Sequence, residues 1–294
     1  MLDWFKRIAT PVPREQLIKN EKPTLPTENQ VERIIGRLGN HNGAANELVV
    51  GLAPMRVIVV ASQKGGVGKT TIAAHMAVRA GMAGQGPVVL VDTDPQGSLS
   101  EWWDARNDVH AQNYECTLNE ECTLNKEHTH NDAPTHYDNV SALVKVKLDD
   151  LTAKLAELRS GGAAVAIIDT PPALTASIAQ VIAMADLVLI PARPSPHDLR
   201  AIGATVNLTR RAGKSFLFVI NGAAPRANIT AEAVAALSEH GRVAPVILYQ
   251  RTDYAASMID GRTVLETTAI GRSAQEIAEL WKYVYAQISL PAAA

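Results

Sequence analysis

Cysteine is scarce in this sequence, and several other features that define protein classes are missing. The 294 residues contain only two cysteines, Cys116 and Cys122, so they build no disulfide framework and favour a reducing compartment. No apolar run is long enough to span a membrane. The first ten residues lack the apolar stretch and cleavage site of a signal peptide. We therefore expect a cytoplasmic protein.

Aromatic side chains and an excess of one charge are also absent. The formal net charge is −2, which excludes a polycation that binds nucleic acid by bulk charge and leaves only a local patch for such contacts. Aromatic residues make up 4% of the chain although hydrophobic residues make up 47%. The apolar content is therefore mostly Ala, Val, Ile and Leu, which suits buried parallel strands covered by alanine-rich helices.

From Arg56 onward, short β-branched runs alternate with longer alanine-rich segments. The candidate strands are residues 57–61, 88–92, 165–169, 187–191, 216–221 and 246–249. The candidate helices lie at about 69–82, 149–160, 175–184, 198–212, 230–240 and 273–288. This alternation predicts an α/β fold with a mostly parallel, twisted sheet and helices on both faces. Ligands of such sheets bind beyond the carboxyl ends of the strands.

Two segments stand outside this pattern and divide the chain. Residues 1–55 are polar and proline-containing, and predict a partly ordered N-terminal extension to a domain at 56–290. Residues 107–139 carry a tandem pentamer and many acidic side chains, and predict an acidic insertion. Two interpretations of the insertion remain open. Its cysteines and histidines could bind zinc, or it is a solvated loop, which the wide Cys116–Cys122 gap and the repeat favour.

A glycine-rich loop lies between the first candidate strand and the first candidate helix. The run Lys64–Thr71 reads KGGVGKTT, and its glycines let the backbone curl so that N–H groups face an anion. Lys69 can reach the β- and γ-phosphates, and the Thr70 hydroxyl can ligate Mg²⁺. Gln63 stands where the full P-loop pattern has glycine, so the loop is a variant with Lys64 at its mouth. A lysine there is poorly placed for its own core and could serve a neighbouring nucleotide.

Carboxylates end two of the candidate strands. Asp92 and Asp94 follow the second strand, and Asp169 ends a later one, so all three should face the loop. One carboxylate can hold a metal-bound water while another orients the attacking water. The alternative for the Asp94–Gly97 run is an ordinary turn.

These motifs together resemble a known family. Lys64–Thr71, Asp92–Gly97 and Ile168–Pro172 resemble the deviant Walker ATPases of the ParA/MinD superfamily, which have the P-loop NTPase fold. Ile190–Asp198 and Gln250–Glu266 resemble the corresponding segments of small plasmid-partition ParA proteins of the ParF type. The resemblance covers the predicted domain but neither the N-terminal extension nor the acidic insertion.

The resemblance implies ATP and Mg²⁺ as cofactors, with the first loop lysine reaching across a dimer to the partner's ATP. The implied nucleotide contacts are Lys64, Gly65, Gly66, Val67, Gly68, Lys69, Thr70, Thr71, Pro194 and Asn221. The implied metal-site residues are Thr70, Asp92 and Asp169, and the implied catalytic residues are Lys64, Lys69 and Asp94.

The resemblance also implies slow, partner-stimulated ATP hydrolysis by an ATP-dependent homodimer that partitions or positions DNA or another cargo. A ParB-like or cargo-adaptor protein would be the stimulating partner. The ATP state would bind DNA nonspecifically and lie on the nucleoid, through C-terminal basic residues such as Arg200, Arg226, Arg251 and Arg262. From Arg193 to the end, eleven basic side chains oppose eight acidic ones, and such a patch binds phosphate weakly and in a salt-sensitive way.

Two other functions of the same fold are alternatives. A MinD-like membrane ATPase ends in a basic amphipathic helix, whereas the last candidate helix has Lys282 as its only lysine, so the membrane is disfavoured as a partner. A metabolic enzyme, either a reductase or an amidotransferase-type synthetase, is the second. The reductase needs cluster cysteines in the body of the domain, where this chain has none, and the synthetase needs a glutaminase domain, for which there is no room.

Overall fold

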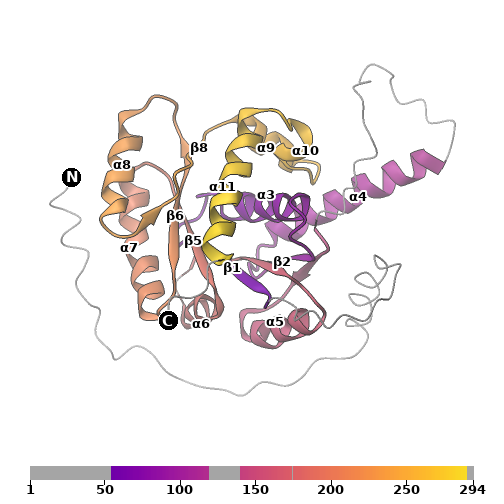
Figure 1. Ribbon diagram of the computed structural model, residues 1–294, viewed down its shortest axis with the longest axis horizontal. Coiled ribbons are helices and arrows are strands. Elements are labelled where there is room, and N and C mark those ends of the chain that lie inside the picture. Colours follow the sequence, from indigo (N-terminus) through magenta and orange to yellow (C-terminus); the bar gives the residue numbers. More distant parts are fainter. Residues whose placement is uncertain (1–53, 119–139, 174, 290–294) are drawn as a thin grey trace.

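The computed structural model describes residues 54–118, 140–173 and 175–289, and its centre is a parallel β-sheet (Figure 1). The strands are β1 (Arg56–Val60), β2 (Val88–Asp92), β3 (Ala142–Lys145), β4 (Val165–Asp169), β5 (Leu187–Ala192), β6 (Phe216–Ala223), β7 (Arg242–Val243) and β8 (Leu248–Tyr249). Their order is β3-β2-β4-β1-β5-β6-β7, with β8 also paired to β6. Every pairing between described strands is parallel. The fold predicted from the sequence is therefore confirmed.

Helices cover both faces of this sheet (Figure 1). They are α3 (Lys69–Met82), α4 (Ser98–Leu118), the 3₁₀ turn η2 (Leu148–Asp150), α5 (Leu151–Ser160), α6 (Ala176–Met184), α7 (Pro196–Arg211), α8 (Asn228–Ser238), α9 (Thr252–Met258), α10 (Val264–Thr267) and α11 (Arg272–Ser289). One face carries α3, the start of α4, α10 and α11, and the other carries α5 to α8. The two layers follow from the strand pattern, because successive side chains of a strand point to opposite faces.

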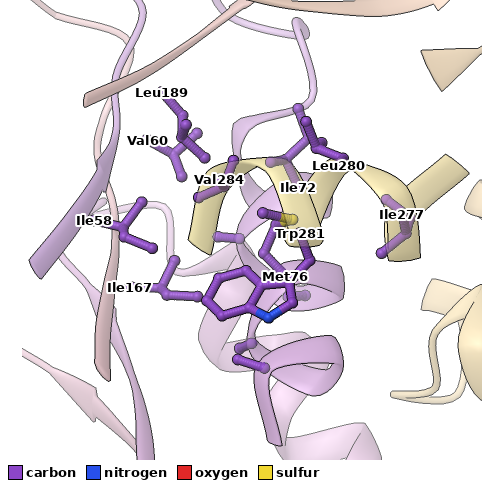
Figure 2. Close-up of a cluster of buried hydrophobic side chains, with 14 of the residues drawn as sticks. Ile58, Val60, Ile72, Met76, Ile167, Leu189, Ile277, Leu280, Trp281 and Val284 are labelled. Atoms are coloured by element: carbon purple, nitrogen blue, oxygen red, sulfur yellow. The ribbon is translucent and has the colours of Figure 1, made fainter. Parts of the chain in front are cut away.

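The face that carries α3 and α11 has a dense aliphatic core around one tryptophan (Figure 2). Trp281 of α11 is fully buried and lies with Ile72 and Met76 of α3 above β1 and β4. Ile58 of β1 and Ile167 of β4 point toward it from the sheet (Figure 2). Helix α11 therefore packs on α3, the helix that follows the glycine-rich loop, and stabilises its position.

Strand register brings the carboxylates to one edge of the sheet. Asp92 is the register partner of Asp169 across β2 and β4, and Val60 is the partner of Asp169 across β1 and β4. Val60 ends β1 just before the glycine-rich loop. The three carboxyl ends therefore lie side by side, as ligand sites of parallel sheets require.

A short C-terminal segment is fastened to α4 by buried polar groups. The Arg106 guanidinium donates to both carboxylate oxygens of Glu266, at 2.6 and 3.1 Å, and to the carbonyl oxygen of Gly261. The Trp102 indole N–H donates to the carbonyl oxygen of Arg262. Gly261 has φ +75°, and a Cβ atom there would lie 2.1 Å from the Arg106 backbone nitrogen. Only glycine allows so close an approach.

The structure also differs from the predictions in places. Helix α4, strand β3 and the short elements β7, α9 and α10 had no predicted counterpart, and the predicted strand 246–249 is reduced to β8. The predicted insertion at 107–139 begins inside α4, because residues 107–118 are helical rather than a loop. The structure does not describe the rest of the insertion, the side chains of the predicted zinc ligands, or the N-terminal extension up to residue 53. Within the described residues, no helix has both the length and the apolarity to cross a bilayer.

Candidate nucleotide site

The glycine-rich loop is a preformed anion cradle. Gly66 and Gly68 have φ +72° and +90°, and Gly68 is the N-cap of α3. The Asn221 side-chain amide donates to the carbonyl oxygen of Val67 at 2.7 Å, and a Cβ atom on Gly68 would lie 2.2 Å from that amide nitrogen. The loop is therefore held by the end of β6, and the N-terminus of α3 adds its positive end to the cradle.

Lys69 lies in the floor of this cradle. Its residue surface is 7% exposed, and burial lowers the pKa of its ammonium group, while Asp169 and Asp94 act in the opposite direction. No ion pair joins Lys69 to a carboxylate in the part of the chain that the structure describes. A buried cation without a close counter-ion is costly in the free protein and is stabilised when an anion enters.

Asp169 and Thr70 meet beside this lysine. The Thr70 hydroxyl donates to Oδ2 of Asp169 at 2.5 Å, while Oδ1 is buried without a hydrogen-bond partner. Burial raises the pKa of Asp169 to about 7, against the opposing effects of Thr70 and Lys69. A hard divalent cation such as Mg²⁺, or a water bound to it, fits the unpaired oxygen and the adjacent hydroxyl.

That cation would need further ligands from outside the protein. The described residues include no group of three or more His, Cys, Asp or Glu side chains placed to hold a metal. Magnesium is commonly bound by one or two protein groups together with substrate phosphates and waters. The donor set of Thr70 and Asp169 suits that mode and does not suit a structural metal centre.

The two aspartates of the second strand have different surroundings. Both oxygens of Asp92 are used inside the chain, since Oδ1 accepts from the Asp94 N–H and Oδ2 accepts from the N–H and hydroxyl of Ser100. Asp94 is half-buried, and its Oδ1 accepts only from the Gln96 N–H, at 3.0 Å. Asp92 thus positions the turn and the start of α4, and Asp94 is directed into the site. The role of Asp92 in the metal shell stays a prediction.

The other loop lysine, Lys64, points elsewhere. Its ammonium group forms an ion pair with Asp198 in the first turn of α7. Asp198 is fixed there by Ser195, whose hydroxyl donates to Oδ2 at 2.6 Å. The Lys64 side chain is 40% exposed, in contrast to buried Lys69. The two lysines therefore have separate environments, as the variant loop pattern suggested.

An open cavity of about 620 Å³ lies over the glycine-rich loop, and Lys64, Asp92 and Asp169 are not among its lining residues. Its lining includes these predicted site residues: Gly65, Gly66, Gly68, Lys69, Thr70, Thr71 and Asp94. The opposite wall was not predicted from the sequence. That wall comes from Trp102 on α4, Met258 on α9 and Arg193 after β5. The motif at 250–266 resembles that of ParF-type proteins, but no local signal in it predicts that it lies over the glycine-rich loop.

The predicted adenine contacts lie at the side of this cavity. Pro194 and Asn221 are half-buried; Pro194 follows β5, and Asn221 lies near the end of the neighbouring strand β6. Neither is among the described residues that line the cavity, and the Asn221 amide nitrogen is already bound to the loop. Their contact with the base stays a prediction.

The predicted DNA-contacting arginines are not equivalent. Arg251 donates to Glu276 through two nitrogens, at 2.5 and 3.1 Å, and Arg262 is paired with Asp260 at 2.5 Å. Arg200 and Arg226 are exposed, the latter in a left-handed backbone conformation with φ 61°. The positive charge of Arg251 and Arg262 is thus partly neutralised within the chain.

His75 links the helix after the loop to the C-terminal segment. Its buried ring has Nδ1 2.8 Å from the carbonyl oxygen of Thr71 and Nε2 3.2 Å from the backbone nitrogen of Val264. Because the carbonyl must accept and the Val264 N–H must donate, the ring is neutral with its proton on Nδ1. Burial lowers the pKa of His75 to about 4.

We expect His75 to lower stability in acid. Its pKa is 6.5 in its ordinary state and about 4 in the folded chain, so the unfolded chain binds the proton more tightly. Stability is therefore complete above pH 6.5 and is lost as the pH falls toward 4, by about 3 kcal/mol at ~1.4 kcal/mol per pKa unit. Urea unfolding of the wild type and His75→Gln, from pH 7 to pH 4, measures this loss.

The comparison of the two proteins is needed because Asp169 acts in the opposite sense. Its pKa is raised to about 7, so its protonation favours the folded chain as the pH falls. Glutamine can donate to Thr71 and accept from Val264 without titrating, so the variant should lose about 3 kcal/mol less than the wild type. If the free energy of unfolding falls by the same amount in both proteins between pH 7 and pH 4, protonation of His75 does not destabilise the folded chain.

Comparisons with known proteins identify the family of this chain. A family model described as an AAA domain matches residues 55–217. Maintenance of carboxysome distribution protein A of Halothiobacillus neapolitanus is 31% identical over 232 residues, which are 74% of this chain and 91% of the relative. Protein ParA of Rhizobium radiobacter is 28% identical over 211 residues, 69% of this chain and 82% of that protein.

Solved structures show the same fold. An ATP complex of a Cyanothece McdA variant has a TM-score of 0.58 and 19% identity, covering 82% of this chain and 99% of the other. The MinD cell division protein of Aquifex aeolicus has a TM-score of 0.59 and 19% identity, covering 80% and 99%. The loop, the strand-end carboxylates and these matches agree, and the chain belongs to the ParA/MinD superfamily of P-loop ATPases.

Proposed function

We propose that this protein is a positioning ATPase that forms a homodimer in its ATP state and hydrolyses ATP slowly until a partner protein stimulates it. The cargo is DNA or a body carried on DNA. The relative from Halothiobacillus is named for the distribution of carboxysomes, and that from Rhizobium is named as a ParA protein, so both kinds of cargo fall within the proposal.

One observation carries this proposal, namely the different placement of the two loop lysines. Lys69 lines the cavity, whereas Lys64 lies outside its lining and is held by Asp198. A lysine tethered at the mouth of its own loop can be released to complete a second subunit's site. ATP would then favour the dimer because it gains contacts there that it lacks in the monomer.

The chain's own groups would divide the chemistry among them. Lys69 and the loop N–H groups would hold the phosphates, and Thr70 with Asp169 would hold Mg²⁺, which neutralises phosphate charge when bound. Asp94, with one carboxylate oxygen free of hydrogen bonds to its own turn, would orient the attacking water. The hydrophobic wall of Trp102 and Met258 would limit the access of bulk water.

DNA binding would follow from dimerisation. In a monomer, two of the predicted DNA contacts, Arg251 and Arg262, are partly neutralised by Glu276 and Asp260. Joining two copies doubles the basic patch, so nonspecific affinity for DNA rises in the ATP state and falls with salt. The ATP-bound protein would therefore lie on the nucleoid and the ADP-bound monomer would leave it.

Lys64→Ala tests the proposal. We expect the variant to bind Mg-ATP within about threefold of the wild type, because Lys64 does not line its own cavity. It should lose the ATP-dependent dimer, and with it the difference between DNA binding in ATP and in ADP. Light scattering after size exclusion gives the dimer, and fluorescence anisotropy with a random duplex at moderate salt gives DNA affinity.

Lys282→Ala is the matched control, since it removes an exposed lysine of α11 far along the chain from the loop. It should behave like the wild type in every measurement. A wild-type protein with equal DNA affinity in ATP and ADP would remove the DNA-positioning function. A wild type that binds ATP but stays monomeric at all concentrations would remove the switch and leave the nucleotide site intact.

A further inference from the structure

Arg193 is a cation of the nucleotide cavity that lies outside the glycine-rich loop. It follows the last residue of β5, Ala192, and lines the same cavity as Gly65, Gly68 and Lys69. The glycine-rich loop and Asp94 line the same cavity from the side of β1 and β2. Arg193 contributes the only arginine among the described residues that line its walls.

The backbone around Arg193 is constrained, so its side chain starts from a fixed place. Pro191 and Pro194 flank it and restrict the chain on both sides. The Ser195 N–H donates to the carbonyl oxygen of Arg193 at 2.7 Å. The Ser195 hydroxyl in turn caps α7 by accepting from the Asp198 N–H. The turn that carries Arg193 is thereby tied to the residue that holds Lys64.

The stem of Arg193 runs along the end of the neighbouring strand. A Cβ atom on Gly222 would lie 3.6 Å from Nε and 3.8 Å from Cγ of Arg193, and Gly222 has φ +65°. Gly222 directly follows Asn221, whose amide is bonded to Val67 of the phosphate loop. The guanidinium therefore lies against the part of β6 that contacts the loop.

Within the described residues Arg193 has no carboxylate partner, as is also true of buried Lys69 but not of four other cations of the chain. Lys64 is paired with Asp198, Arg106 with Glu266, Arg251 with Glu276 and Arg262 with Asp260. The exposed Arg193 side chain makes no hydrogen bond, ion pair or ring contact within the described part of the chain. Its planar fork of five N–H donors is free to bind two oxygens of one anion.

We propose that Arg193 binds the polyphosphate chain of the nucleotide in this cavity. This assignment rests on the proposed function, because it needs a nucleotide in the site. Together with Lys69 and the loop N–H groups, Arg193 would enclose the phosphates from the side of β5 and β6. A guanidinium donates two parallel hydrogen bonds to a phosphate, so it orients that group as well as attracting it.

The test compares Arg193→Gln and Arg193→Lys with the wild type, and uses ATP, ADP and adenosine as competitors of a fluorescent nucleotide. Arg193→Gln should weaken ATP and ADP binding about tenfold, the loss expected for a partly exposed charged hydrogen bond. Adenosine should compete equally well against all variants. Arg193→Lys should fall between the two, because it keeps the charge but loses the fork. The advantage of the wild type should shrink as salt rises.

Arg211→Gln is the matched control, since Arg211 is also exposed but lies at the opposite end of α7. It should bind as the wild type does, and unfolding midpoints should be similar in all variants. If Arg193→Gln binds ATP within twofold of the wild type, the assignment is wrong while the proposed function stands. If adenosine loses as much affinity as ATP, the arginine contacts the base and the assignment is also wrong. If the wild type shows no magnesium-dependent affinity for ATP, both fall.

Discussion

Replacing Lys69 by alanine should abolish ATP turnover, with a fall of at least about 100-fold in the hydrolysis rate. Lys69 is the buried cation in the floor of the cavity, and no other ammonium group lines it among the described residues. Charge that develops on the transferred phosphoryl group would lose its nearest compensation. Phosphate release under saturating ATP measures the rate, and nucleotide titration measures the binding loss.

The same variant should remain folded, and this separates a chemical role from a structural one. Burial lowers the pKa of Lys69, which means that the free protein is destabilised by keeping this group charged. Removing the charge should therefore not lower the thermal unfolding midpoint. Lys282→Ala again serves as the reference, with wild-type turnover. A Lys69→Ala protein that hydrolyses ATP within tenfold of the wild-type rate would contradict the placement of this lysine on the phosphates.

Replacing Arg106 by leucine should reduce the free energy of unfolding by about 3–5 kcal/mol. The side chains of Arg106 and Glu266 are each only 3% exposed, so the substitution leaves a carboxylate buried without its partner. The carbonyl oxygen of Gly261 also loses its donor. Urea unfolding at neutral pH measures the loss. If Arg106→Leu is too unstable to be folded in buffer alone, its unfolding is measured in the presence of a stabilising salt.

The double variant Arg106→Leu with Glu266→Leu makes the test specific. It leaves no unpaired charge in the interior, so it should recover much of the loss that Arg106→Leu causes alone. Arg262→Ala is the exposed counterpart, because its ion pair with Asp260 has side chains 42% and 34% exposed. It should lose no more than about 1 kcal/mol. Equal losses for the buried and the exposed arginine would show that burial of the pair is not what matters.

The parts of this molecule that were predictable from sequence are those with a local signal. The glycine spacing in Lys64–Thr71 and the apolar runs that end in Asp92 and Asp169 are each recognisable within a few residues of sequence. The structure places them at one edge of the sheet. Parallel strand pairing then predicts that these motifs lie close together, because the carboxyl ends of parallel strands lie at the same edge of the sheet. The approximate bounds of most strands and helices followed in the same way.

Features that depend on distant partners were not predictable. Helix α4 has a polar sequence, and its inward face is Leu99, Trp102 and Arg106, the last of which is buried only because Glu266 lies opposite. Nothing near Lys64 in sequence marks Asp198 as its partner. Likewise, the Asn221 bond to the loop joins residues 154 positions apart.

The location of Trp281 has a practical consequence for anyone trimming this protein. The family match ends at residue 217, yet α11 supplies Ile277, Trp281 and Val284 to the core around the first strand. A fragment that ends at residue 217 would expose the apolar side of α3 that α11 covers, and we expect it to aggregate. The smallest piece worth expressing therefore extends through residue 289, well past the end of the family match at residue 217.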